Sequence, residues 1–259
     1  MENNIVNQIK DQLRDKLVVL FWSGGYESTL LLHLVVKHKI YNLCNLHVIT
    51  VQCPHDIYRQ KLNKEWLDVL QNKIVWHNIM PTKTIPKDIE YRKACNVCKN
   101  IRRECITQQL EVIKQNNPNR EILLVTGHNL DDVASYYFEN ALYCLDKETY
   151  AKKHNRILET TNKLYPIFRY DQTYTFFRPL SFYTKNQLLH VFSEKDHDDN
   201  TLCFKQCFWI NQRKRLLQRY LNDSNVPLDF EQVKQAFLRN TQLPNMEEYS
   251  TLPLETYLM

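Results

Sequence analysis

Glycine is nearly absent from this sequence. Only three of the 259 residues are glycine, whereas average usage is about 7%. All three lie in two short segments, Ser23–Ser28 (SGGYES) and Thr126–Asp132 (TGHNLDD). Because glycine accepts positive φ and lets another group approach the main chain closely, we expect a ligand to lie against the backbone at these segments.

Long apolar runs are also missing. The longest, 16–22 and 30–36, are too short and too interrupted to cross a bilayer. The N-terminal residues Met-Glu-Asn-Asn-Ile are polar and acidic, whereas a signal peptide needs a basic start and an apolar core. We therefore expect a cytoplasmic protein without a membrane segment, whose eight cysteines are thiols rather than disulfides.

Strand and helix patterns alternate along the first half of the chain. Apolar, β-branched runs predict strands at 17–22, 46–51, 73–79 and 121–126, and helical spacing predicts helices at 28–39, 57–70, 98–115 and from 130 onward. This order predicts an α/β fold with a doubly wound parallel sheet. Both glycine segments follow strands, and ligands bind such sheets at the carboxyl ends of the strands.

The last third of the chain has a weaker pattern. Residues 176–180 predict a last strand or a loop, and 184–192 predict a helix. A basic helix through Arg219, a helix near 230–238 and a polar tail follow. We expect a main domain at 1–210 and a small helical C-terminal extension at 211–259.

The segment Ser23–Ser28 has the composition of a phosphate-binding loop. Its glycines let backbone amides point at phosphate oxygens, the following helix supplies partial positive charge, and Ser23 and Ser28 add hydroxyl donors. It is not a Walker loop, because no Gly-Lys-Ser/Thr follows, and not a dinucleotide fingerprint, because the third glycine is missing. For Gly24-Gly25 alone, an ordinary tight turn is an equal explanation, but the whole hexapeptide favours a nucleotide.

The second segment places polar groups at the mouth of the fourth predicted strand. Carboxylates beside a polyphosphate are favourable chiefly when a divalent cation bridges them, so Asp131 and Asp132 are candidate magnesium ligands. The alternative is helix capping and compensation of the helix dipole. His128 either contacts nucleotide or substrate or has a structural role.

The cysteines form two close pairs. Cys95 and Cys98 have metal-ligand spacing, and nearby lysines and arginines favour the thiolate. Cys203 and Cys207 form the second pair, and the two pairs together would make one site. The spacing leaves zinc, iron-sulfur and redox roles open. The remaining cysteines are expected to be buried or incidental: Cys44, Cys53, Cys105 and Cys144.

The two glycine segments resemble signatures of a known family. Ser23–Ser28 looks like the PP-loop (Ser-Gly-Gly-x-Asp-Ser) of the N-type ATP pyrophosphatases, which adenylate a substrate and release pyrophosphate; Glu27 stands where the family usually has Asp. Thr126–Asp132 resembles the second signature of the tRNA thiolation branch, which makes 2-thiouridine or 2-thiocytidine. The resemblance implies a Rossmann-like adenine nucleotide alpha hydrolase fold. It implies that ATP is held by Ser23, Gly24, Gly25, Glu27, Ser28, Gly127, His128, Asp131 and Asp132.

The resemblance also implies a use for the cysteines. In these enzymes a Cys-x-x-Cys between the third and fourth strands joins one later cysteine to hold a [4Fe-4S] cluster with one iron open for sulfide. Cys95 and Cys98 match the pair, and Cys203 is the expected third ligand. Cys207 is left open as the third ligand itself, a fourth ligand or a persulfide-bearing thiol. The candidate catalytic residues are Cys95, Cys98, Cys203 and Asp132.

A basic and aromatic surface indicates an RNA partner. Arg213–Arg215 and Arg219 form a basic stripe on a predicted helix, and Arg169, Arg178 and Lys185 lie near aromatic residues. Cations neutralise RNA phosphates and aromatic rings stack on bases, although a solvated helix face explains any single residue as well. The net charge of +5 is compatible with such a partner.

These features predict an ATP- and Mg²⁺-dependent enzyme that adenylates a pyrimidine carbonyl oxygen of tRNA and replaces it with sulfur. The sulfur would come from sulfide, a persulfide or a carrier protein, and a homodimer is left open. One alternative is adenylation followed by nitrogen transfer or ligation, as in lysidine or preQ0 synthesis, with structural zinc. The other is a degenerate PP-loop that only binds RNA or a partner.

Overall fold

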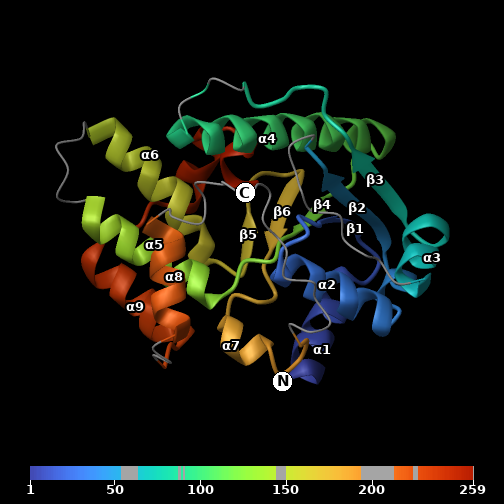
Figure 1. The fold of residues 1–259 in the computed structure, drawn as a ribbon, viewed down its shortest axis with the longest axis horizontal. Helices are drawn as coiled ribbons and strands as arrows, with labels where there is room; N and C mark the ends of the chain where they lie inside the picture. The colour runs from blue at the N-terminus through green and yellow to red at the C-terminus, as the bar shows by residue number, and fades with distance from the viewer. Residues whose placement is uncertain are drawn as a thin grey trace.

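The strands form one sheet at the centre of the molecule (Figure 1). The computed structural model describes residues 1–53, 64–86, 89, 91–143, 150–193, 213–223 and 227–258. Its six-stranded sheet has the order β3-β2-β1-β4-β6-β5. The strands are β1 (Leu17–Phe21), β2 (Asn45–Val51), β3 (Val75–Ile79), β4 (Ile122–Val125), β5 (Ile167–Arg169) and β6 (Tyr174–Phe177). All neighbours are parallel except β5, which is antiparallel to β6, so the predicted α/β fold is confirmed.

The strand order reverses beside β1. The chain proceeds from β1 outward to β2 and β3, and then returns to place β4 on the other side of β1. In α/β sheets this reversal opens a crevice at the carboxyl ends of the two strands, where ligands bind. The segment Ser23–Ser28 follows β1 after one intervening residue, and Thr126–Asp132 follows β4 directly. The topology therefore brings both glycine segments to the same crevice.

Successive residues of β1 pack into two different apolar cores, one on each face of the sheet. Val18 and Leu20 pack with α1 (Glu2–Leu13), α2 (Tyr26–Lys37) and α3 (Lys64–Asn72). Leu17 and Val19 face the opposite core, to which α4 (Tyr91–Asn116) contributes. Successive side chains of a strand point to opposite faces, and a strand that is apolar on both faces is typical of a sheet covered twice. Figure 1 shows α4 on one side of the sheet and α1 and α2 on the other.

A third apolar cluster joins helices beside the sheet. It unites α5 (Leu130–Tyr143), α8 (Arg213–Asp223) and α9 (Phe230–Asn240), which lie together in Figure 1. Helix α6 (Tyr150–Thr161) precedes the 3₁₀ helix η2 (Asn162–Leu164) and β5. The other short helices in the described residues are η1 (Ile40–Asn42), α7 (Lys185–Leu188), η5 (Met246–Thr251) and η6 (Leu254–Tyr257).

The C-terminal residues are not a polar tail, and this expectation was wrong. Tyr249 and Tyr257 are completely buried and belong to the same core as Phe168 and Phe176 of the sheet. Two tyrosines thus give a segment of mostly polar residues enough apolar surface to pack. The C-terminal part is helical, as predicted, while the domain boundary at residue 210 stays a prediction.

Several other expectations differ from the structure. Helices α1 and α6 were not predicted, and α7 covers only Lys185–Leu188 of the helix expected at 184–192. Helix α3 is described from Lys64, so the start expected at residue 57 lies outside the described residues. Among the helices of the described part, none has the length and apolarity that a bilayer span requires.

Candidate functional site

The turn after β1 is held in shape by its own side chains. Gly24 has φ of 80°, in the left-handed region that favours glycine. The hydroxyl of Ser28 accepts a hydrogen bond from the backbone N–H of Ser23 (3.2 Å) and donates to the carbonyl of Gly25 (2.9 Å). The Ser23 hydroxyl lies 3.0 Å from that of Ser28. Gly25 is the N-cap of α2 and provides no capping side chain, so the positive end of the helix dipole faces this loop.

Gly127 packs directly against this loop. A Cβ atom added to Gly127 would lie 2.9 Å from the backbone nitrogen of Ser28 and 3.0 Å from the carbonyl carbon of Glu27. Both atoms belong to the main chain, which has no freedom to withdraw locally. The end of β4 therefore approaches the first turn of α2 as closely as only glycine permits.

Two further contacts join the segments. The side-chain amide of Asn129 donates to Glu27 Oε1 over 3.2 Å. Asn129 also begins α5 through a reciprocal cap, in which its Oδ1 accepts from the N–H of Asp132 (3.0 Å) and its own N–H donates to Asp132 Oδ2 (3.1 Å). Asn129 thus fixes the start of α5 and at the same time contacts the segment Ser23–Ser28.

The two neighbouring aspartates have different surroundings. Asp131 is 3% exposed, and its Oδ2 accepts from the backbone N–H of Lys185 (2.7 Å). Burial raises the pKa of Asp131 to about 6, against the opposing hydrogen bond from Lys185. Asp132 is half-buried, and its Oδ1 accepts from the side-chain amide of Gln218 in α8 (2.7 Å). Asp131 therefore anchors the start of α7, whereas Asp132 lies nearer to solvent.

The histidine and the lysine beside these motifs are held in place. His128 is half-buried, with Nδ1 2.9 Å from the hydroxyl of Thr126. The ammonium of Lys185 lies 5.4 Å from the ring centroid of Tyr26, the first residue of α2. Lys185 was expected on an RNA surface, but its ammonium lies beside the first residue of α2.

Gln218 is a site residue that the sequence did not indicate. A glutamine in a basic helix 86 residues beyond Asp132 carries no motif. The apolar contacts of Leu221 and Phe237 with α5 give α8 and α9 their positions. Only this packing brings Gln218 to the carboxylate of Asp132, so the local sequence around Gln218 does not predict the contact.

Helix α4 carries the first cysteine pair. Cys95 and Cys98 lie three positions apart in it, and the thiol of Cys98 is half-buried. Arg102 donates from Nε to Cys98 Sγ over 3.5 Å and from Nη1 to the carbonyl of Val51 over 2.7 Å. Val51 ends β2, so the arginine ties the cysteine helix to the carboxyl edge of the sheet.

The predicted cluster site extends beyond the described residues. Cys203, Cys207 and Cys144 lie outside them, as do the side chains of Arg213–Arg215. Within the described part of the chain, no three His, Cys, Asp or Glu side chains are grouped to hold a metal ion. Cys53 is buried, and Cys44 and Cys105 are half-buried thiols whose pKa is raised by burial. The metal-ligand role of Cys95, Cys98, Cys203 and Cys207 stays a prediction.

Arg178 is not part of an RNA surface, and this expectation was wrong. The residue is completely buried, and its guanidinium donates to the carbonyls of Asn162 and Tyr165 and to the Asn162 side chain. It lies 5.7 Å and 5.2 Å from the ring centroids of Phe168 and Phe176. Burial lowers its pKa to about 9. The arginine-aromatic combination in the sequence therefore reflects core packing.

Comparison with known proteins gives a fold relationship. No family model and no curated protein matches the sequence. The U34-tRNA thiolase NcsA from Methanococcus maripaludis, solved with its [4Fe-4S] cluster, matches with a TM-score of 0.59 and 16% identity over 92% of this chain and 79% of that chain. NMN synthetase from Francisella tularensis matches with a TM-score of 0.46 and 12% identity, over 98% and 95% of the two chains. The chain thus has the α/β fold of the thiolase NcsA, in agreement with the fold that its resemblance to the PP-loop ATP pyrophosphatases predicts.

Proposed function

We propose that this protein is an ATP-dependent tRNA thiolation enzyme of the PP-loop type. The observation that carries the proposal is the direct contact between the two signature segments, through Gly127 against Ser28 and through Glu27 to Asn129. The contact lies where the strand order reverses, which is where α/β sheets bind ligands. The fold similarity to a tRNA thiolase that carries an iron-sulfur cluster supports the same assignment.

In this proposal the loop Ser23–Ser28 binds the phosphates of ATP. The positive end of α2 stabilises negative charge on the phosphates. Asp132 is the carboxylate that we assign to Mg²⁺, because it is half-buried whereas Asp131 is 3% exposed. Glu27 belongs to the same loop and holds it against the start of α5 through Asn129.

The reaction has two balanced steps. The carbonyl oxygen of a tRNA pyrimidine attacks the α-phosphorus of ATP, and the bond to the β-phosphate oxygen breaks to release pyrophosphate. Sulfide then attacks the activated ring carbon, and the carbon–oxygen bond breaks so that the oxygen leaves with AMP. If the donor is a persulfide, a second thiol has to break the sulfur–sulfur bond afterwards, and the donor leaves as a disulfide. Adenylation turns a poor leaving group into a good one, and backbone amides offset the charge that develops on the phosphates.

Cys95 and Cys98 are the first two residues that we assign to sulfur handling, with Cys203 as the third. When bound to them, a [4Fe-4S] cluster would supply an iron with an open position for sulfide. The thiolate set suits iron-sulfur ligation, and α4 brings two of its members one turn apart. Arg102 holds this helix to β2 and contributes positive charge beside Cys98.

Mass spectrometry of tRNA nucleosides tests the proposal. A strain that lacks this gene should lose one thiolated pyrimidine, and plasmid-borne wild-type protein should restore it. A Ser23→Ala, Ser28→Ala double variant should fail to restore it and should not release pyrophosphate from ATP. An unchanged nucleoside profile in the deletion strain would overturn the proposal, and full activity of the double variant would identify a PP-loop that does not use ATP.

Anaerobic purification tests the proposed cluster separately. We expect a brown protein with broad visible absorption and about four irons per chain, which a Cys98→Ala variant does not retain. A colourless protein with stoichiometric zinc would contradict the cluster and favour the nitrogen-transfer or ligase chemistry.

A further inference from the structure

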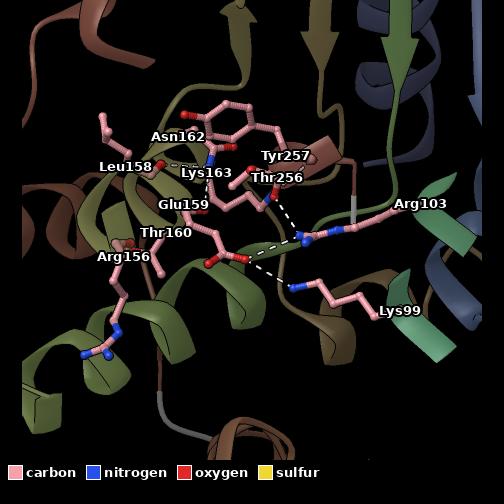
Figure 2. A network of polar contacts seen from close by, with 10 residues as sticks. All are labelled: Lys99, Arg103, Arg156, Leu158, Glu159, Thr160, Asn162, Lys163, Thr256 and Tyr257. Carbon is pink, nitrogen blue, oxygen red and sulfur yellow. Dashed lines mark hydrogen bonds and ion pairs between the residues drawn. The ribbon is translucent and has the colours of Figure 1, made fainter. Parts of the chain in front are cut away.

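A basic pocket lies between the cysteine helix and helix α6. It has a volume of about 390 Å³ and is lined by residues of α4, α6 and the C-terminal segment. The lining residues are Arg103, Lys152, Asn155, Arg156, Glu159, Leu252 and Thr256. Figure 2 shows Arg103 and Lys99 reaching Glu159 from α4, while Arg156 extends from α6. The pocket is separate from the crevice that the glycine segments form.

Positive charge dominates this pocket. Arg103, Lys152 and Arg156 are cationic, and Glu159 is the acidic lining residue. Burial alone would raise the pKa of Glu159, but Lys99 and Arg103 outweigh it and lower the pKa. The carboxylate lies 3.1 Å from the Lys99 ammonium and 3.4 Å from the Arg103 guanidinium. The negative charge is thus already compensated by protein groups on α4.

Arg103 is held in position on the protein. Its Nη2 donates to the carbonyl of Thr256 over 2.8 Å, and its side chain is 16% exposed. Its Nε is buried and has no hydrogen-bond partner among the described residues. The guanidinium is therefore fixed in orientation without having used all its donors on the protein. A preorganised guanidinium is well suited to phosphate oxygens.

The pocket lies close to the cysteine pair along α4. Lys99 follows Cys98 directly, and Arg103 lies five positions after Cys98. At about 1.5 Å rise per residue this is roughly 7.5 Å along the helix axis. Lys152 is exposed and Arg156 half-buried, one turn apart on α6. An anion bound here would lie within a few turns of the proposed sulfur site.

We propose that this pocket binds a backbone phosphate of the RNA substrate and thereby positions the target nucleotide near Cys98. This inference rests on the proposed function, because it assigns a docking surface to the same reaction. Cations on two facing helices suit a phosphodiester chain that crosses between them. The surface differs from the stripe at Arg213–Arg219 that the sequence indicated.

Charge reversal on α6 tests the surface. The Lys152→Glu, Arg156→Glu double variant should bind unmodified tRNA at least tenfold more weakly than wild type in filter binding at 0.1 M salt. The slope of log K against log salt should fall by about 0.7 to 0.9, which is the contribution of the one phosphate contact that the pocket provides. An Arg156→Lys variant, which keeps the charge, should bind within about threefold of wild type.

A matched control reverses the charge of two residues at the amino ends of strands β3 and β4. Lys73 and Arg120 are exposed residues that precede β3 and β4, so Lys73→Glu, Arg120→Glu should leave tRNA affinity and salt slope close to the wild type. Both variants should keep the circular dichroism spectrum of the folded protein and bind ATP with wild-type affinity in calorimetry. Equally weakened tRNA binding in both variants would show that net charge explains the effect, and would overturn the proposed role of the pocket.

The outcomes separate this inference from the proposed function. If wild-type protein thiolates tRNA and the Lys152→Glu, Arg156→Glu variant binds and thiolates equally well, only the docking surface is wrong. If wild-type protein does not bind tRNA and the deletion strain keeps its thiolated nucleosides, the proposed function itself fails. If 10 mM inorganic phosphate binds the pocket but does not compete with tRNA, the pocket takes a small anion and the inference is overturned.

Discussion

The Glu27 carboxylate accepts a hydrogen bond from the Asn129 side chain, with 3.2 Å between Oε1 and Nδ2, across 102 residues of sequence. Asn129 simultaneously caps α5 through Asp132. The contact therefore couples the first turn of α2 to the first turn of α5. The glutamate, which is one methylene longer than the aspartate usual in PP-loops, has a structural role in this chain as well as a position beside the predicted phosphates.

Two substitutions at Glu27 separate its structural role from its charge. Glu27→Gln keeps an oxygen that can accept from Asn129, so the free energy of unfolding should stay within about 0.5 kcal/mol of wild type, whereas Glu27→Ala should lose about 1 kcal/mol. Urea denaturation monitored by circular dichroism measures both. Equal stability of the two variants would show that the bond to Asn129 contributes nothing.

Gly127 should not tolerate even a methyl group. Its Cβ would meet the backbone nitrogen of Ser28 at 2.9 Å, and relief of such overpacking typically costs about 1 to 3 kcal/mol. We expect Gly127→Ala to lower the thermal midpoint and to weaken ATP binding in calorimetry, because the loop must move. Gly25→Ala is the control, since its Cβ would meet a side-chain oxygen of Ser23 at 3.3 Å and should be the milder change. A greater loss in Gly25→Ala would contradict the close approach of β4 to α2.

The sequence predicted the parts of this molecule that have local signals. Apolar runs identified four of the parallel strands, β1 to β4, and the three glycines identified the two loops that meet at the carboxyl ends of β1 and β4. It did not predict the partners that come from distant packing, such as Gln218 on Asp132. Arg178 was misassigned because an arginine among aromatics has the same sequence pattern in a core as on an RNA surface, and only burial distinguishes the two.

Asp131 should make stability depend on pH. Burial raises its pKa to about 6 from an ordinary value near 3.8, so the folded state favours the protonated carboxyl. This contribution is fully present below about pH 3.8 and is lost as pH rises through 6. It amounts to about 3 kcal/mol by the usual conversion. In an Asp131→Asn variant the side-chain oxygen can still accept from Lys185 N–H, and the titration is removed.

The measurement is the free energy of unfolding of wild type and Asp131→Asn between pH 4.5 and 8. Titrations shared by both proteins cancel in the difference. The variant should gain stability relative to wild type as pH rises, most steeply near pH 5, midway between the ordinary and the raised pKa. A difference that stays constant across this range would show that Asp131 ionises in the folded state as easily as in water.

Gln218 offers a test of whether α8 belongs to the site. Its amide donates to Asp132 over 2.7 Å, and hydrogen bonds to charged groups contribute about 1.5 to 3 kcal/mol. Gln218→Met keeps the length of the side chain and removes the donor, so it should lose up to about that amount of stability.

Gln218→Glu places a second carboxylate against Asp132, so repulsion should disfavour ionisation of the pair unless a cation lies between them. Mg²⁺ relieves this repulsion, so we expect Gln218→Glu to require less Mg²⁺ than Gln218→Met for half-maximal pyrophosphate release. The same Mg²⁺ requirement in both variants would show that Asp132 does not bind the metal and that its carboxylate only caps α5.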